Sequence, residues 1–149
     1  MATVNARDLN QYRLRLAEGF LREAEQDFTL ERWRSCVDSA QLATENAGKS
    51  VLALLGVVPK THDPAQQIAQ VLRAQILPPA LRESMEKMLP DLLALGSAEH
   101  FLTDYGDEAR HKLPWDLFDR DNASDALLSA RRSVDSARAV ALGWNRPNS

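Results

Sequence analysis

The amino-acid sequence predicts an all-α protein, an up-and-down bundle of about five helices. Three observations lead to this prediction. Alanine, leucine, arginine, glutamate and glutamine are abundant, and β-branched and aromatic residues are scarce, which favours helix. Apolar residues recur in steps of three and four, and no stretch alternates with a period of two. The 6 Gly and 7 Pro leave little room for long irregular segments.

The bulk properties predict a single domain over residues 1–149, with a short polar tail at about 144–149. A chain of 149 residues that is 44% hydrophobic and 26% charged can bury a sizeable core. A net charge of −3 argues against wholesale nucleic-acid binding but allows a local basic patch. The N-terminus lacks an apolar run, the stretch 51–58 is too short to span a membrane, and the single Cys36 excludes an internal disulfide. We therefore expect a cytoplasmic protein that does not act at a membrane.

The first two predicted helices cover about 7–28 and 30–55. Apolar residues in the first helix follow one face, in steps of three and four. The second helix has a longer row of apolar residues with the same spacing, which is typical of a helix packed against another helix. Thr29 is expected to cap the second helix and Gly56 to end it.

The third predicted helix has a clear start signal in the sequence. Asp63 is expected to be its cap, Pro64 its first residue, and Gln66 the second half of a capping box. This helix is expected to run to about residue 76, where a pair of prolines interrupts it.

The C-terminal half is expected to hold two more helices. A fourth helix over about 79–103 contains Pro90, which must kink or split it. A polar loop at 105–121 follows. Asn122 is then expected to cap the last helix, which ends at Gly143.

The stretch DEARHKLPW, residues 107–115, is the strongest candidate for a functional site. It places Arg110, His111 and Lys112 side by side, with acidic residues on both sides. Most other charges in the chain fit the solvated faces of helices. The same residues could also form a polar loop whose acidic and basic side chains neutralise one another, and both interpretations stay open at this point.

Two metal or phosphate motifs are weak in this chain. Glu108 and His111 form one Glu-x-x-His pair, but a di-iron bundle needs two such pairs and two further glutamates. The triplet at 48–50, Gly-Lys-Ser, lacks the earlier glycine of a phosphate-binding P-loop, so Lys49 is expected to be a surface residue paired with Glu45. No metal and no cofactor are predicted.

A longer part of the sequence resembles the HEPN-domain family. The segment FLREAEQDFTLERWRSCVDSAQLATENAGKSVLALLG resembles the first two helices of these proteins. The loop from Pro59 to His62, and the later segment TDYGDEARHKLPWDLFDRDNASDALLSA, also resemble the family. The resemblance covers most of the chain and implies a HEPN-like helical bundle.

Many HEPN proteins are metal-independent ribonucleases, and this resemblance raises that activity as an alternative. Their signature is an Arg followed directly by a polar residue, and a His that four to six residues separate from the Arg. Arg110 and His111 supply the first half, but positions 115–117 are Trp, Asp and Leu. An altered ribonuclease, of the kind that acts as a toxin, would use Arg110 to hold the phosphate and His111 to move the proton.

The branch of the family that lacks the catalytic His implies the preferred function. We expect a non-catalytic module that binds a nucleotide or RNA, with Arg110, His111 and Lys112 as an anion-binding cluster. Tyr105 or Trp115 would stack on a base, and the face that carries Lys49 would contribute. A homodimer and a minimal nucleotidyltransferase partner, in a toxin–antitoxin or defence-type system, are the implied partners. A ligand-free protein-interaction scaffold is the second alternative.

Overall fold

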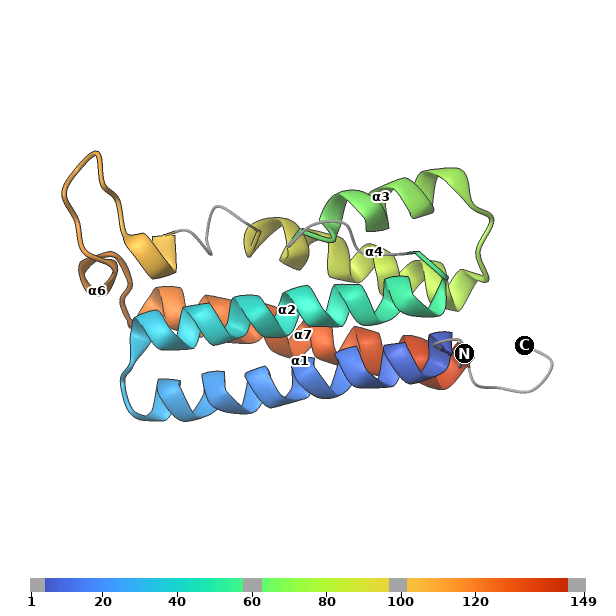
Figure 1. The fold of residues 1–149 in the computed structure, drawn as a ribbon, viewed down its shortest axis with the longest axis horizontal. Helices are drawn as coiled ribbons and strands as arrows, with labels where there is room; N and C mark the ends of the chain where they lie inside the picture. The colour runs from blue at the N-terminus through green and yellow to red at the C-terminus, as the bar shows by residue number, and fades with distance from the viewer. Residues whose placement is uncertain (1–4, 58–62, 97–101, 145–149) are drawn as a thin grey trace.

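The structure is a computed structural model that describes residues 5–57, 63–96 and 102–144. Three long helices lie side by side at its centre: α1 (Ala6–Thr29), α2 (Trp33–Leu54) and α7 (Arg120–Trp144) (Figure 1). The chain reverses between α1 and α2, whereas α2 and α7 run in the same direction. This arrangement confirms the prediction of an all-α bundle.

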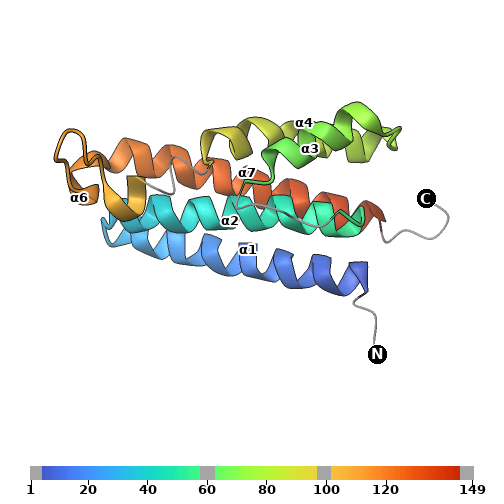
Figure 2. The same cartoon turned by 45° about the horizontal axis from the view of Figure 1, so that its top comes forward.

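Two further helices cover one side of this central layer. α4 (Pro79–Ala94) packs against α7 and α2, and α3 (Ala65–Ala74) lies over α4 (Figure 2). A short helix, α6 (Pro114–Leu117), lies at the end of the bundle where α2 and α7 begin. None of the described helices combines the length and the apolar character that crossing a membrane requires.

The prediction that Thr29 caps the second helix is wrong. Thr29 is the last residue of α1, and its hydroxyl donates a hydrogen bond to the Glu25 carbonyl at 3.1 Å. A threonine hydroxyl can bond to the preceding helical turn as well as cap a new helix, so its residue type does not decide between the two. The chain then turns through Glu31, whose φ is 60°, and α2 begins at Trp33.

The third helix begins one residue later than expected, because Pro64 stands just before its first residue, and of the predicted capping bonds the one to Asp63 is present. Asp63 Oδ1 accepts a hydrogen bond from the Ala65 N–H at 3.1 Å, and α3 runs from Ala65 to Ala74. The predicted length of the fourth helix is wrong, because α4 ends at Ala94 and Thr103 belongs to a separate helical turn at 102–105.

Pro90 does not split α4. The helix is continuous through Pro90, which lies four residues before its last residue. A proline removes one backbone donor and disturbs the carbonyl four residues earlier, and at this position only the last turn of α4 follows the disturbed bond.

The last helix begins with a reciprocal cap that differs from the predicted one. The Asn122 N–H donates to Asp119 Oδ1 at 2.9 Å, and the Asp119 N–H donates to Asn122 Oδ1 at 3.0 Å. Asp119 is therefore the capping residue and Asn122 completes the capping box inside the first turn. The prediction of Asn122 as the cap was one turn too late, because either polar residue fits that role in the sequence.

The core is built around α2, which is buried along most of its length. Its small residues let neighbours come close, and Gly48 shows this most clearly. A Cβ at Gly48 would lie 2.8 Å from Pro64 Cγ and 3.0 Å from Leu92 Cδ2. The largest fully buried apolar side chains come from α2, α3 and α4: Leu52, Ile68, Met85, Met88 and Leu92.

An ion pair joins α4 to α7. Asp91 is 8% exposed at its side chain, and its two oxygens accept from Arg132 Nη2 at 2.8 Å and Nε at 3.2 Å. The hydrogen bond to Asp91 and its charge raise the pKa of Arg132. The two hydrogen bonds and the positive charge of Arg132 compensate the Asp91 carboxylate for the water that it loses between α4 and α7.

Arg132→Ala is expected to lower the free energy of unfolding by about 1–2 kcal/mol, because it leaves the Asp91 carboxylate without its partner at a largely buried position. Urea denaturation followed by circular dichroism would measure the change. Lys87→Ala, which removes an exposed ion pair to Glu83, is the matched control and should change stability by less than about 0.5 kcal/mol. Equal effects of the two substitutions would contradict this role for Asp91.

Candidate functional site

The stretch singled out by the sequence forms a tight turn at one end of the bundle, which we call the 107–112 turn. Two backbone hydrogen bonds of 2.9 Å, Asp107 N–H to Lys112 O and Lys112 N–H to Asp107 O, close it. Inside it, Asp107 Oδ1 accepts from the Arg110 N–H at 3.2 Å, and the His111 N–H donates to Glu108 O at 3.2 Å. The turn is therefore held by its own backbone and by one aspartate side chain.

Two residues in this region have a left-handed backbone. Gly106 has φ 73°, and a Cβ there would lie 2.2 Å from Lys112 O and 3.0 Å from Pro114 Cδ. Only glycine fits this position without a clash. His111 has φ 54°, an uncommon conformation for a residue with a side chain. Such a backbone is maintained only where the surrounding structure holds it.

The chain on both sides of the turn is attached to α2 through Arg34. Arg34 Nη1 donates to the Thr103 carbonyl at 2.9 Å, and its guanidinium lies 5.9 Å from the centre of the Trp115 ring. Thr103 is fully buried, and its hydroxyl bonds to Asp38 Oδ1 at 3.2 Å. One arginine in the first turn of α2 thus positions the segments that enter and leave the 107–112 turn.

The predicted site residues of this segment lie together and are exposed. Arg110, His111 and Lys112 occupy consecutive positions in the turn, and the Arg110 side chain is 75% exposed. Two aromatic residues flank them in sequence: Tyr105 is 64% and Trp115 69% exposed. Basic side chains and exposed aromatic rings therefore occur in one short segment, a combination found in proteins that bind single-stranded nucleic acid.

The charges of the turn are only weakly paired. Arg110 Nε lies 3.7 Å from Asp107 Oδ2, longer than a hydrogen bond, and both groups face solvent to some degree. An exposed pair of this kind contributes little to stability, so breaking it costs little. Lys112 adds a second cation in the same turn.

Lys49 lies elsewhere in the molecule. It is 15 residues along α2 from Arg34, about 22 Å at the rise of an α-helix. Its Nζ pairs with Glu45 Oε2 at 3.4 Å, as predicted, but both side chains are buried rather than on the surface. The structure does not bring Lys49 to the 107–112 turn.

His62 and the loop from Pro59 lie outside the described residues. Among the residues that are described, no group of three or more His, Cys, Asp or Glu side chains is placed to hold a metal ion. Glu108 and His111, the candidate metal pair, are joined instead by a backbone hydrogen bond within the turn.

Arg34 is the residue of this site that the sequence did not reveal. It lies 69 residues before Thr103 and 81 before Trp115 in the sequence, and no local pattern links these positions. In the sequence it is one of several charges beside Trp33. Only the packing of α2 against the segment around the 107–112 turn shows its role.

The comparisons with known proteins agree with this fold. A family model described as "HEPN domain" matches residues 11–139. A solved structure, the crystal structure of TT1696 from Thermus thermophilus, matches with a TM-score of 0.67 and 21% identity. The match covers 88% of this chain and 97% of that one, and at this identity it shows the fold alone. No curated protein matches this chain.

The family model spans most of the chain, from α1 to the last part of α7. It includes the 107–112 turn and the residues that hold it. The resemblance noted in the sequence is thereby confirmed, and the chain belongs to the HEPN-domain family.

Proposed function

We propose that this HEPN domain binds a phosphate group of a nucleotide or RNA at the 107–112 turn and does not cleave it. At the level of the family, HEPN domains are nucleotide- or RNA-related modules. The observation that carries the proposal is the exposure of Arg110, His111 and Lys112 on one closed turn. Arginine can hold a phosphate through two parallel hydrogen bonds, and Tyr105 or Trp115 can stack on a base.

The non-catalytic part of the proposal rests on the residues that follow Arg110. Positions 115–117, where the ribonuclease signature has its histidine, lie in α6 and carry Trp115, Asp116 and Leu117. An imidazole is the usual group for moving the 2′-hydroxyl proton of RNA near neutral pH. His111 is adjacent to Arg110 instead, which makes the altered ribonuclease the second candidate.

The partner proposals follow from the family. HEPN domains commonly dimerise, and we extend a homodimer to this chain. A minimal nucleotidyltransferase, in a toxin–antitoxin or defence-type system, would be the protein partner. The exposed side chains of Tyr105, Leu113 and Trp115 support a role for the same end of the bundle as a scaffold for another protein.

Arg110→Ala is expected to weaken binding of a short single-stranded RNA and of ATP by tenfold or more, because a charged hydrogen bond to phosphate contributes about 1.5–3 kcal/mol. Titrations at two salt concentrations, followed by fluorescence anisotropy or calorimetry, would measure this. The dependence of affinity on salt should also become shallower.

Arg73→Ala is the matched control for this titration. Arg73 is an exposed arginine on α3, and Figure 1 shows this helix at the other end of the bundle from α6, which follows the 107–112 turn. The Arg73→Ala variant should bind RNA and ATP with the same affinities as the wild-type chain. An equal loss in both variants would indicate nonspecific attraction to positive charge, and no binding by the wild-type chain would reject the nucleotide and RNA proposal.

A further inference from the structure

A hollow with apolar walls, which we call the apolar hollow, lies between the ends of several helices. Its walls come from three parts of the chain: the end of α2, the connection from α3 into the first turns of α4 (residues 75–84), and the end of α7. Figure 1 shows these parts at the end of the bundle away from α6. The hollow has a volume of about 900 Å³, and small-molecule sites usually have about 300–1,000 Å³.

The walls of the apolar hollow carry no charge. Among the described residues, fourteen line it and none of these is charged, although 26% of the residues in the chain are. Twelve of them are apolar or glycine, and the other two are Gln75 and Ser84. A charged ligand would lose water here without gaining a counter-charge, which is costly, so the walls favour an uncharged ligand.

Three large apolar side chains of the lining are also exposed to solvent. Ile76 is fully exposed, Leu142 is 71% exposed and Trp144 is 44% exposed. Single exposed apolar residues are ordinary on a protein surface, but a group of them around one hollow often marks a binding site. Ile76 belongs to the connection between α3 and α4, whereas Leu142 and Trp144 belong to α7, so two separate walls contribute to the group.

Hydrogen bonds hold the wall formed by the connection between α3 and α4 in place. Arg82 Nη2 donates to the Leu72 carbonyl at 2.8 Å and to the Gln75 carbonyl at 3.0 Å. Pro78 and Pro79 restrict the backbone that follows. A ligand would therefore meet a wall that the fold has already ordered, which lowers the entropy cost of binding.

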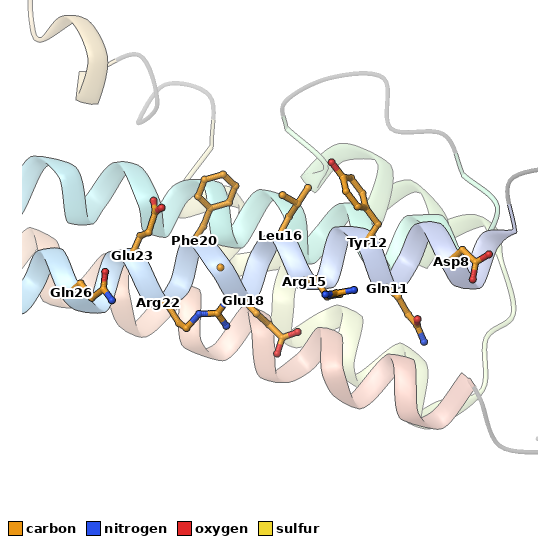
Figure 3. Close-up of a pocket in the computed structure, with 11 residues that line it drawn as sticks. Asp8, Gln11, Tyr12, Arg15, Leu16, Glu18, Phe20, Arg22, Glu23 and Gln26 are labelled. Atoms are coloured by element: carbon orange, nitrogen blue, oxygen red, sulfur yellow. The ribbon is translucent and has the colours of Figure 1, made fainter.

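A second hollow, along α1, lacks these properties. All of its described lining residues come from that one helix, and five of them are charged: Asp8, Arg15, Glu18, Arg22 and Glu23 (Figure 3). One helix face cannot surround a small molecule, and this mixture of charges is typical of a solvated helix surface. The apolar hollow, with walls from three parts of the chain, is the better candidate for a ligand site.

We propose that the apolar hollow binds a neutral, mainly apolar small molecule that carries one or two hydrogen-bonding groups. The apolar walls provide the affinity, and the Trp144 ring covers part of the ligand. The Gln75 amide and the Ser84 hydroxyl make no hydrogen bond within the described residues, so both can pair with a polar group of the ligand. A phosphate finds no counter-charge here, so this site is separate from the 107–112 turn and does not depend on the function proposed there.

Dye displacement tests both the site and the charge of its ligand. N-phenyl-1-naphthylamine is a neutral dye whose fluorescence rises in apolar surroundings, and its signal should rise and saturate with the wild-type chain. 1-Decanol should displace the dye. Decanoate has the same chain length but is ionised at neutral pH, and it should displace the dye at least about tenfold more weakly, because no cation lines the hollow.

Leu142→Lys tests whether the dye binds in the apolar hollow. It should weaken dye and 1-decanol binding about tenfold and narrow the difference between 1-decanol and decanoate, because the lysine brings a cation to the site. Leu93→Lys is the matched control, since Leu93 is 64% exposed on α4 and does not line the hollow, and it should bind as the wild type does. Ile76→Lys repeats the test on another wall, at a fully exposed residue whose replacement leaves the fold intact. Thermal unfolding of each variant verifies the fold.

Several results would overturn the proposal. One is a wild-type chain that gives no rise in dye fluorescence, and another is an equal loss of binding in Leu142→Lys and Leu93→Lys. Decanoate that displaces the dye as well as 1-decanol does would rule out the predicted preference for a neutral ligand. A chain that fails to bind the dye but forms a dimer in sedimentation velocity, lost in Leu142→Lys, would assign these residues to contact with a second copy instead.

Discussion

Gly48→Gln is expected to lower the free energy of unfolding by about 3 kcal/mol or more. The new Cβ would lie 2.8 Å from Pro64 Cγ and 3.0 Å from Leu92 Cδ2, so α2 would have to move away from the residue before α3 and from α4. The amide would also be buried among apolar groups. Urea denaturation followed by circular dichroism would measure the loss.

Gly19→Gln is the matched control for that substitution, because it makes the same change in the interior of α1. Its Cβ meets only the flexible end of Arg22, so the helix should gain up to about 1 kcal/mol from the better helix former. The comparison is made at a concentration where the chain is monomeric. Similar losses of stability in the two variants would contradict the close packing at Gly48.

Gly106→Ala is expected to open the 107–112 turn and to abolish ligand binding there. The methyl group would lie 2.2 Å from Lys112 O, and the backbone at φ 73° is strained for any residue with a Cβ. The two hydrogen bonds between Asp107 and Lys112 cannot then stay at 2.9 Å. Hydrogen exchange at these two amides should become faster, and the RNA affinity should fall at least as far as in Arg110→Ala.

Gly56→Ala is the control that separates the effect of backbone strain at a positive φ from the effect of the steric clash at Gly106. Gly56 also has φ 73°, but nothing lies within 4 Å of its Cβ position. It should cost only about 1 kcal/mol of stability and leave RNA affinity unchanged. An RNA affinity that stays at the wild-type value in Gly106→Ala would show that the closed turn does not matter for binding.

The three central helices could be predicted from the sequence because their apolar period is long and local. Their caps could not, since Thr29 or Asn122 can bond within its own helix as well as cap a new one. The end of α4 was missed for a different reason. α4 ends at Ala94, two residues before Gly96, and a glycine just past the last helical residues favours a helix end.

The candidate site could be predicted as a stretch of sequence but not as a shape. Arg110, His111 and Lys112 were visible as a cluster, whereas the closed turn depends on Gly106 and on contacts with Lys112 and Pro114. The anchoring by Arg34 joins residues far apart in the chain. Gly19 and Gly48 look alike in the sequence, and only the space around each Cβ position distinguishes an open helix face from a core contact.

The most direct test of the central claim is a time course of fluorescence anisotropy with an end-labelled single-stranded RNA, the wild-type chain and EDTA. Binding without cleavage predicts an immediate rise in anisotropy that then stays constant and is largely lost in Arg110→Ala. A rise followed by a steady fall as the label is released, absent in Arg110→Ala and His111→Ala, would show that the 107–112 turn is a ribonuclease centre.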